Sequence, residues 1–422
     1  MINPRDIKIS CYDYELPDHR IAKYPLEVRD QSKLLVYDCG EKSIDERHFF
    51  NLPEIVPEGS MMVFNNTKVI QARLHFRKPT GGVVEVFCLE PELPKDYQQN
   101  FASEKECVWT CLVGNSKKWK EGSLSLPIAL ADGRTTTLYC ERAGEPGPSQ
   151  KIRFYWEGGI AFAQLLDAIG ELPIPPYLNR ETEEKDKDTY QTVYSRIKGS
   201  VAAPTAGLHY TDRVLDALKA KDISLQYLTL HVGAGTFKPV KSETIEGHDM
   251  HTEFISVPLD VIRNIACFID TRRPGAKFVA TGTTSVRTLE SLYYIGEKIA
   301  ANPEAQAEEL VVHQWEPYDS RHTMTIGESL GHIIAYLERH GLDSLVTATQ
   351  ILISPGFEYR LVDAIVTNFH MPQSTLLLLV SAFVDDPEKA LTIDANWRRI
   401  YGYALSHDFR FLSYGDSSIL LR

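Results

Sequence analysis

Two patterns of hydrophobic and polar positions alternate along the chain. Short apolar runs at 32–37 and 61–64 predict β-strands. From about 68 to 156, short strand patterns are separated by turn residues without any helical period, which is typical of a small barrel or sandwich. We therefore predict an inserted β-barrel domain over residues 65–156.

Beyond residue 159 the pattern becomes mixed. Residues 160–169 have helical spacing, and Gly170 follows as a stop signal. Strands alternating with helices indicate an α/β layer; the predicted strands are 225–230 and 277–280, and the predicted helices are 212–220, 257–269 and 284–295. The fold class that we predict is an α/β (mixed) domain formed by residues 1–64 and 157–422, interrupted by the barrel.

Composition is ordinary for a globular protein: 422 residues, 43% hydrophobic and 24% charged. The N-terminus lacks a basic-apolar secretion signal, and the longest apolar run, 376–384, is too short to cross a bilayer. The seven cysteines are scattered without a Cys-x-x-Cys pair, which argues against zinc-ribbon and iron–sulfur sites. We expect a cytoplasmic protein with no membrane association.

The net charge of −12 opposes a broad, non-specific hold on nucleic acid. Residues 65–80 nevertheless contain five basic or imidazole side chains and no acid. This segment is either a solvated basic hairpin or a phosphate contact.

Residues 199–211 combine small side chains with a single imidazole, His209, and precede the predicted helix 212–220, which Thr211 can cap. Such a stretch is either a tight buried loop or a seat for an anion or nucleotide. Three more loops of similar character are 230–237, 281–287 and 367–370. Because ligands gather at the carboxyl ends of strands in α/β sheets, we expect the four loops to converge on one cleft.

The glycines of 233–235 lack the third glycine of a dinucleotide fingerprint, and the chain has no P-loop motif. Thr283, Thr284 and Ser285 offer hydroxyls and backbone N–H groups at a helix start, and Arg287 adds a fork for a carboxylate or phosphate. Helix capping is the alternative explanation for this hydroxyl cluster.

His248, His251 and Glu253 form the densest group of potential ligands or acid–base residues. With His209 and His231 they could complete a zinc site, although no His-Glu-x-x-His pattern is present. Alternatively, His251 and Glu253 form a hydrogen-bonded acid–base pair, because a carboxylate can fix the tautomer of a histidine that titrates near neutral pH.

Motifs in a fixed order along the whole chain resemble one family, the S-adenosylmethionine:tRNA ribosyltransferase-isomerases of queuosine biosynthesis. The motifs are Glu15-Leu16-Pro17, Ile21-Ala22-x-Tyr24-Pro25, Phe64-Asn65-Asn66-Thr67, 82–86, Tyr190-Gln191-Thr192-Val193-Tyr194, 202–211, 230–240, 282–291, Thr367-Asn368-Phe369-His370-x-Pro372-x-Ser374-Thr375-Leu376 and Ser413-Tyr414-Gly415-Asp416.

The resemblance implies an α/β catalytic domain interrupted by a β-barrel. It implies transfer and isomerisation of the ribosyl group of S-adenosylmethionine onto 7-aminomethyl-7-deazaguanine at the wobble position of tRNA. The products would be epoxyqueuosine tRNA, adenine and methionine. S-adenosylmethionine would be a substrate; no prosthetic group or metal would be needed, and the enzyme would act on the anticodon loop as a monomer.

The chemistry implied by this resemblance requires a base beside the sulfonium, an acid for departing adenine and donors for the sugar oxygens. For proton transfer we select His209, His251 and Glu253, with the alternative that His209 only orients the sugar. Arg287 would hold the methionine carboxylate. The cofactor and sugar would be lined by Thr205, Gly207, Gly233, Gly235, Thr236, Thr283, Thr284 and Ser285. The base or tRNA backbone would contact Asn65, Asn66, Lys68 and Arg73.

Two features depart from the family pattern. The segment 296–346 is longer than the usual connection, and Gln350 stands where the family commonly has an acid after threonine. A diverged paralogue with another substrate would fit these departures. Two further alternatives are a metal-dependent hydrolase using His209, His231, His248 and His251, and a non-catalytic RNA-binding paralogue.

Overall fold

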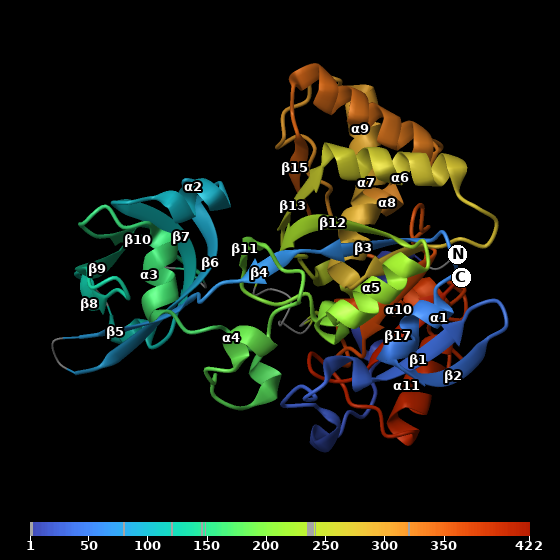
Figure 1. The fold of residues 1–422 in the computed structure, drawn as a ribbon, viewed down its shortest axis with the longest axis horizontal. Helices are drawn as coiled ribbons and strands as arrows, with labels where there is room; N and C mark the ends of the chain where they lie inside the picture. Colours follow the sequence, from blue (N-terminus) through green and yellow to red (C-terminus); the bar gives the residue numbers. More distant parts are fainter. Residues whose placement is uncertain are drawn as a thin grey trace.

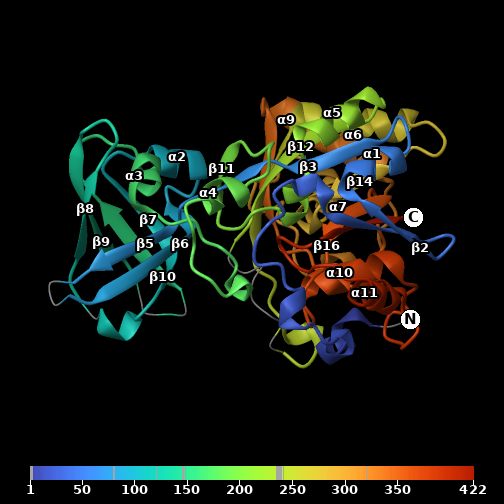
Figure 2. The ribbon, with the colours of Figure 1, turned by 60° about the horizontal axis from the view of Figure 1, so that its bottom comes forward.

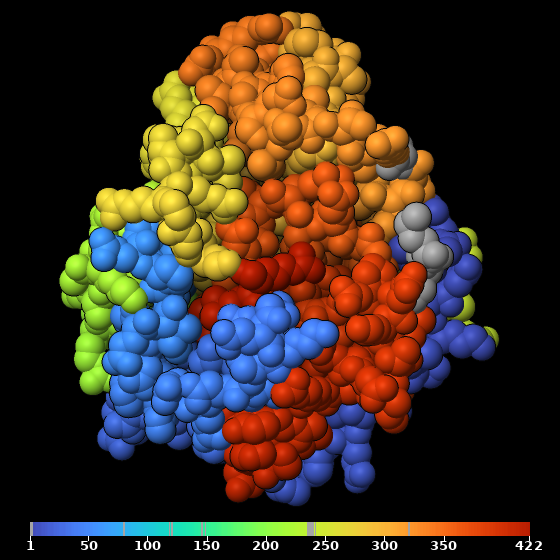
Figure 3. All heavy atoms as spheres, turned by 90° about the vertical axis from the view of Figure 1, so that its right-hand side faces the viewer, coloured from blue at the N-terminus to red at the C-terminus, as the bar shows by residue number. Residues whose placement is uncertain are grey.

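The computed structural model describes residues 3–78, 81–119, 121–144, 147, 149–233, 240, 242–319 and 321–422. A β-barrel lies beside a larger α/β body, which contains both chain ends (Figure 1). In Figure 3 the N-terminal and C-terminal segments lie against each other on one face of the larger body, in agreement with the parallel pairing of β1 with β17. The predicted fold class, a mixed α/β domain with a small β-barrel, is confirmed.

A mixed nine-stranded sheet organises the larger body. Its strands β12, β3, β14 and β16 run parallel. Antiparallel pairing adds β13 and β15 at one side and β17 at the other, where β1 pairs parallel with β17 and antiparallel with β2. In spatial order the strands are β15 (Ser344–Thr349), β13 (Glu253–Pro258), β12 (Ser224–His231), β3 (Met61–Asn65), β14 (Phe278–Thr281), β16 (Ala364–Asn368), β17 (Ser417–Leu421), β1 (Lys33–Asp38) and β2 (Ser43–His48).

Alternate residues of the central strands reach opposite faces of the sheet. Met61 and Val63 of β3 pack into one core, whereas Met62 and Phe64 pack into another. This period of two follows from the pleat of a strand that is covered on both faces. The first core contains α6 (Leu259–Thr271), α7 (Thr283–Ala301), α9 (Ile326–His340), α10 (Thr375–Val384) and α11 (Asn396–Ser406), and the second contains α1 (Leu52–Ile55) and α5 (Asp212–Ala220).

Several predicted boundaries require correction. The helix predicted from 257 begins at Leu259, because Val257 still pairs with Leu345 in the sheet. Helix α7 starts at Thr283 and continues to Ala301, beyond the predicted end at 295. Helix α5 has its predicted bounds, and the Thr211 hydroxyl accepts from the Val214 N–H as the expected cap.

Six antiparallel strands close the barrel, in the order β10 (Gln150–Tyr155), β7 (Glu106–Val113), β6 (Val83–Leu93), β5 (Arg73–Arg77), β8 (Leu124–Ala129) and β9 (Thr135–Arg142). Cys107 and Cys111 share its buried face, as the strand pattern predicted. Helices α2 (Tyr97–Ala102) and α3 (Phe162–Ile169) contribute to the same core. The domain boundaries at 65 and 156 stay a prediction.

The barrel and the larger body meet at a short two-stranded sheet of β4 (Thr67–Val69) and β11 (Ile197–Ser200), visible between them in Figure 2. Tyr97 of the barrel stacks on His231 of β12 with ring centroids 4.1 Å apart. In the part of the chain that the structure describes, no helix has the length and apolar character that crossing a membrane requires.

Candidate active site

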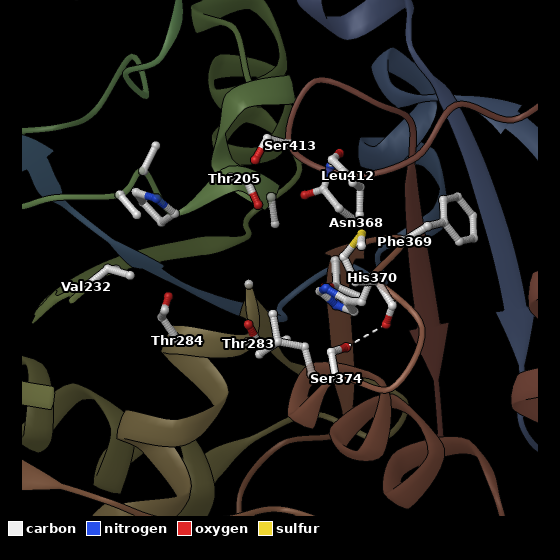
Figure 4. Close-up of a pocket in the computed structure, with 18 of the residues that line it drawn as sticks. Thr205, Val232, Thr283, Thr284, Asn368, Phe369, His370, Ser374, Leu412 and Ser413 are labelled. Carbon is white, nitrogen blue, oxygen red and sulfur yellow. Dashed lines mark hydrogen bonds between the residues drawn. The ribbon is translucent and has the colours of Figure 1, made fainter. Parts of the chain in front are cut away.

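The four small-residue loops converge on one cavity, as expected from their positions after strands. The cavity lies at the carboxyl ends of β12, β14 and β16, beside the start of α7 (Figure 4). It contains about 720 Å³ of empty space, part of it open to solvent. We call it the nucleoside cavity; its lining includes Ala202, Ala203, Pro204, Thr205, Ala206, Val232, Gly282, Thr283, Thr284, Thr367, Asn368, His370, Met371, Ser374, Leu412 and Ser413.

A glycine makes the turn that brings α7 to this cavity. Gly282 has a φ of +84°, a conformation that side chains disfavour. The turn places Thr283 and Thr284 in the lining, whereas the Ser285 hydroxyl donates to the Thr281 carbonyl at 2.7 Å. Ser285 is fully buried and is not among the described residues that line the cavity, so its contact with the cofactor or sugar stays a prediction.

The polar groups in the cavity wall are hydroxyls, one amide and one imidazole. Among the described residues that line the cavity, none carries an Asp, Glu, Lys or Arg side chain. The imidazole belongs to His370, whose Nε2 lies 3.0 Å from the Thr367 Oγ1. Burial lowers the pKa of His370 to about 3, so the ring is neutral at physiological pH. Sequence reasoning noted this loop but assigned His370 no role.

His209 lies behind the cavity wall. Its Nδ1 is 2.8 Å from the Ser32 Oγ, and its Nε2 is 3.0 Å from the Asn368 Nδ2. The ring stacks on Phe49 at 5.1 Å between centroids. Burial, together with the charges of Arg410 and Arg29, lowers the pKa of His209 to about 3. Because both ring nitrogens are engaged, the geometry favours orientation over proton transfer, and the proton-transfer role stays a prediction.

A second group of side chains carries charge. Arg287 of α7 forms an ion pair with Glu253 of β13, and both are almost fully buried. The other Glu253 oxygen lies 3.2 Å from the His251 Nε2, which confirms the predicted contact of this pair. The Arg287 Nε donates to the Ile351 carbonyl at 3.2 Å, and its buried Nη2 has no hydrogen-bond partner within the described part of the chain.

Glu90 of the barrel joins this group across the junction. A β-bulge between Cys88 and Glu90 shifts the register of β6 against β7. The Glu90 Oε1 is 3.6 Å from the position of a Cβ on Gly233, the residue after Val232 of the cavity. Burial raises the pKa of Glu90, His251 lowers it and Glu253 raises it further. We call Arg287, Glu253, His251 and Glu90 the charged row.

Sequence reasoning missed Glu90. Glu90 is one of three acids in the same strand pattern, with Glu85 and Glu92, and no local spacing links it to His251, Glu253 or Arg287, which lie far away in the chain.

Other predicted site residues lie elsewhere. Gly207 is beneath Tyr194, whose Oη would be 2.0 Å from an added Cβ, so this glycine serves close packing. Asn65 is fully buried, and its amide bonds to the Leu230 backbone, while its contact with the base or the tRNA backbone stays a prediction. Gly235 and Thr236 lie outside the described residues.

The remaining predicted tRNA contacts lie at the junction. Asn66 and Lys68 are half-buried there, and the Asn66 Oδ1 accepts from the Thr229 Oγ1 at 2.7 Å. Arg73 of β5 lies 3.7 Å from a Glu85 oxygen.

The four histidines of the metal-site alternative are not brought together. His209 contacts Asn368, while His231 stacks on Tyr97 and lies 3.3 Å from the Thr67 Oγ1. Within the described ranges, no group of three or more His, Cys, Asp or Glu side chains could hold a metal ion.

The long segment 296–346 supports the loop that leads to His251. The Gln314 amide accepts from the Met250 N–H at 2.9 Å and donates to the His248 carbonyl at 2.7 Å. The Gln350 Nε2 donates to the Thr252 Oγ1 at 2.9 Å. Both departures from the family pattern thus lie around this loop and outside the lining of the nucleoside cavity.

Comparison with known proteins gives matches along the whole chain. The family model described as queuosine biosynthesis protein matches residues 9–420. The S-adenosylmethionine:tRNA ribosyltransferase-isomerase of Halothermothrix orenii is 36% identical over 416 residues, which cover 98% of this chain and 100% of the relative. A crystal structure of S-adenosylmethionine tRNA ribosyltransferase from Thermotoga maritima is 28% identical, covers 98% of this chain and 100% of its own, and has a TM-score of 0.45. The resemblance seen in the motifs is confirmed, and the chain belongs to the queuosine biosynthesis family, together with the S-adenosylmethionine:tRNA ribosyltransferase-isomerase of H. orenii.

Proposed function

We propose that the protein transfers and isomerises the ribosyl group of S-adenosylmethionine onto 7-aminomethyl-7-deazaguanine in tRNA. The products are epoxyqueuosine tRNA, adenine and methionine. The observation that carries this proposal is the family match over residues 9–420, with a relative of that activity aligned over its full length.

The site supports this function because its two parts match the two halves of S-adenosylmethionine. The nucleoside cavity has hydroxyl, amide and imidazole groups but, among its described lining residues, no charged side chain, which suits adenine and ribose. The charged row suits the methionine end. The Arg287 Nη2 is the donor for the carboxylate, and Glu90 faces the positive sulfonium.

The α7 start connects the two parts. Thr284 lines the nucleoside cavity, and Arg287 follows three residues later, about one helical turn along the axis. A ligand whose ribose contacts the Thr283 and Thr284 hydroxyls therefore directs its 5′ substituent toward the charged row.

His251 is the residue that we assign to proton abstraction from the carbon beside the sulfonium. It is about one-quarter exposed, and Glu253 holds its Nε2. A histidine held by a buried carboxylate can take a proton, and the adjacent positive sulfur stabilises the carbanion that results. Proton transfer of this kind contributes roughly 10²–10⁴-fold to rate.

The tRNA enters beside the junction, and Asn66, Lys68 and Arg73 are the residues that we assign to its backbone; the partial exposure of Asn66 and Lys68 supports this assignment. Recognition is confined to the anticodon loop that presents the wobble base, and the enzyme acts as a monomer in the cytoplasm. These assignments rest on the proposed reaction and on the position of β4 at the edge of the site.

The test incubates the protein with S-adenosylmethionine and tRNA that carries the deazaguanine precursor. Mass analysis should detect free adenine and the epoxyqueuosine nucleoside. Folded protein that releases no adenine and forms no modified nucleoside would overturn the proposal, and stoichiometric zinc in the purified protein would favour the hydrolase alternative.

A further inference from the structure

Asn368, at the end of β16, presents an unused acceptor to the nucleoside cavity. Its side chain is 3% exposed, and its Oδ1 is buried without a hydrogen-bond partner among the residues that the structure describes. In Figure 4 this amide lies beside Thr205, on the side of the cavity away from Val232 and Thr284. A buried acceptor without a partner is costly, so the position fits a group that a ligand satisfies.

Hydrogen bonds to the backbone fix which end of the amide faces the ligand. The Asn368 Nδ2 donates to the Leu412 carbonyl at 3.2 Å and lies 3.4 Å from the Asp416 carbonyl. A flipped amide would place an acceptor against both carbonyls, so only this orientation satisfies them. The Oδ1 is therefore the end of the amide that is left for a ligand donor.

His209 completes this arrangement from behind. Because the Asn368 Nδ2 can only donate, the His209 Nε2 is the acceptor of their 3.0 Å contact. The His209 proton therefore resides on Nδ1, which donates to the Ser32 Oγ at 2.8 Å. The neutral ring that burial enforces is the form that this chain of contacts requires.

We propose that the Asn368 Oδ1 accepts a hydrogen bond from the exocyclic amine of adenine, and that Ser32 and His209 are positioning residues for this contact. The proposal rests on the proposed function, which supplies S-adenosylmethionine as the ligand. The amine is chosen over a ribose hydroxyl because the sugar belongs at the Thr283 and Thr284 end, next to the charged row. At the Asn368 end, Leu412 and Met371 add apolar lining for a planar ring.

The test compares the affinities of S-adenosylmethionine and S-inosylmethionine, measured by calorimetry without tRNA. The inosine base has a carbonyl oxygen where adenine has the amine, so it sets an acceptor against the Asn368 Oδ1. Wild-type protein should bind the inosyl compound about tenfold or more weakly, since a site built around one hydrogen bond rejects a ligand that lacks it. Equal affinities would overturn the proposal. If the protein binds neither compound alone, the same comparison is made as kcat/KM for base release with precursor tRNA, where equal values would overturn the proposal and no base release would instead refute the proposed function on which it rests.

The Asn368→Ala variant should reduce this discrimination to about twofold or less. Ser413→Ala is the matched control, because Ser413 lines the same cavity but contacts the Tyr177 hydroxyl. The ratio of its affinities for S-adenosylmethionine and S-inosylmethionine should equal that of the wild type. A folded Asn368→Ala protein with undiminished discrimination would contradict the assignment. If this variant does not fold, the ratio of the two affinities in the wild type and in the His209 variants tests the assignment of Asn368.

Two variants separate positioning by His209 from proton transfer. His209→Gln can keep an acceptor for the Asn368 Nδ2, whereas His209→Leu cannot. His209→Gln should retain kcat within about tenfold and the wild-type pH profile, and His209→Leu should lose adenine discrimination. A loss of roughly 10²-fold or more in kcat for His209→Gln, with loss of one limb of the pH profile, would show that His209 transfers the proton.

Discussion

The nucleoside cavity and the charged row are neighbours on α7, yet they are built from different chemistry. The cavity uses hydroxyls and the Asn368 amide, with no charged side chain among its described lining residues. The charged row buries an arginine–glutamate pair and adds His251 and Glu90. A neutral wall can select a ligand by shape and hydrogen-bond pattern at little desolvation cost, whereas buried charges are tolerated only when they are paired.

With these two kinds of surroundings, one site can hold a ligand that has a neutral half and a charged half. Thr284 and Arg287 are separated by one helical turn, so a short path along α7 leads from neutral to charged surroundings. Among the described residues, the barrel contributes Glu90 to the charged row and none to the cavity lining. The two regions should therefore respond differently to substitution.

The largest effect is expected from Arg287→Leu. This variant leaves the Glu253 carboxylate buried without its arginine, which should lower the free energy of unfolding by about 3–5 kcal/mol. Urea denaturation measures the change. The double variant Arg287→Leu/Glu253→Leu should recover most of the loss, and a single variant that costs less than about 1 kcal/mol would show that the pair does not behave as a buried ion pair.

His251→Gln tests the chemical role of the charged row. We expect kcat for adenine release to fall roughly 10²–10³-fold while KM for S-adenosylmethionine changes little, because a base acts on the reacting carbon rather than on binding. Single-turnover assays with precursor tRNA measure this. His248→Gln, three residues earlier, is the control and should retain most activity; equal losses in both variants would remove His251 from the chemistry.

The cavity should respond to pH through His370. Its pKa is lowered to about 3, below the value near 6.5 of an unfolded chain, so below pH 6.5 the unfolded state binds a proton that the folded state does not. His370 therefore destabilises the fold as pH falls, by about 1.4 kcal/mol per pH unit. The difference in unfolding free energy between His370→Gln and wild type should shift by about 2–3 kcal/mol from pH 6 to pH 4, in favour of the variant. Parallel stability curves would contradict a neutral, buried His370.

Glu90→Gln should have the smallest effect of these variants. It tests whether Glu90 recognises the positive charge of the sulfonium or only the shape of the ligand. Removing this carboxylate should raise the Kd for S-adenosylmethionine about tenfold, but that for S-adenosylhomocysteine, which has no sulfonium charge, less than about twofold. Glu92→Gln is the matched control, because Glu92 lies on the same strand and pairs with Lys151. Equal changes for both ligands would mean that Glu90 does not interact with the sulfonium.

The sequence predicted the architecture well wherever periodicity is distinctive. The barrel strands and the alternation of strands with helices followed from periods of two and 3.6 residues. It failed at Val257, because an apolar residue before Pro258 suits a strand end as well as a helix start, and the pairing with Leu345 decides.

The loops that form the candidate site could be predicted from the sequence, but the contacts between their side chains could not. Thr205, Thr283 and Thr284 line the cavity. They could be predicted because small residues and hydroxyls that follow strands are typical of loops that bind ligands. Glu90 and the Asn368–His209 contact could not be predicted, since each depends on side chains brought together from distant segments. Burial also decided which hydroxyls serve the fold, as for Ser285.

A crystal structure of the complex with S-adenosylmethionine tests the division between neutral and charged regions most directly. We expect adenine in the nucleoside cavity with its amine at the Asn368 Oδ1, and the methionine carboxylate at the Arg287 Nη2. A reversed ligand, with methionine in the cavity and adenine at the charged row, would contradict this expectation.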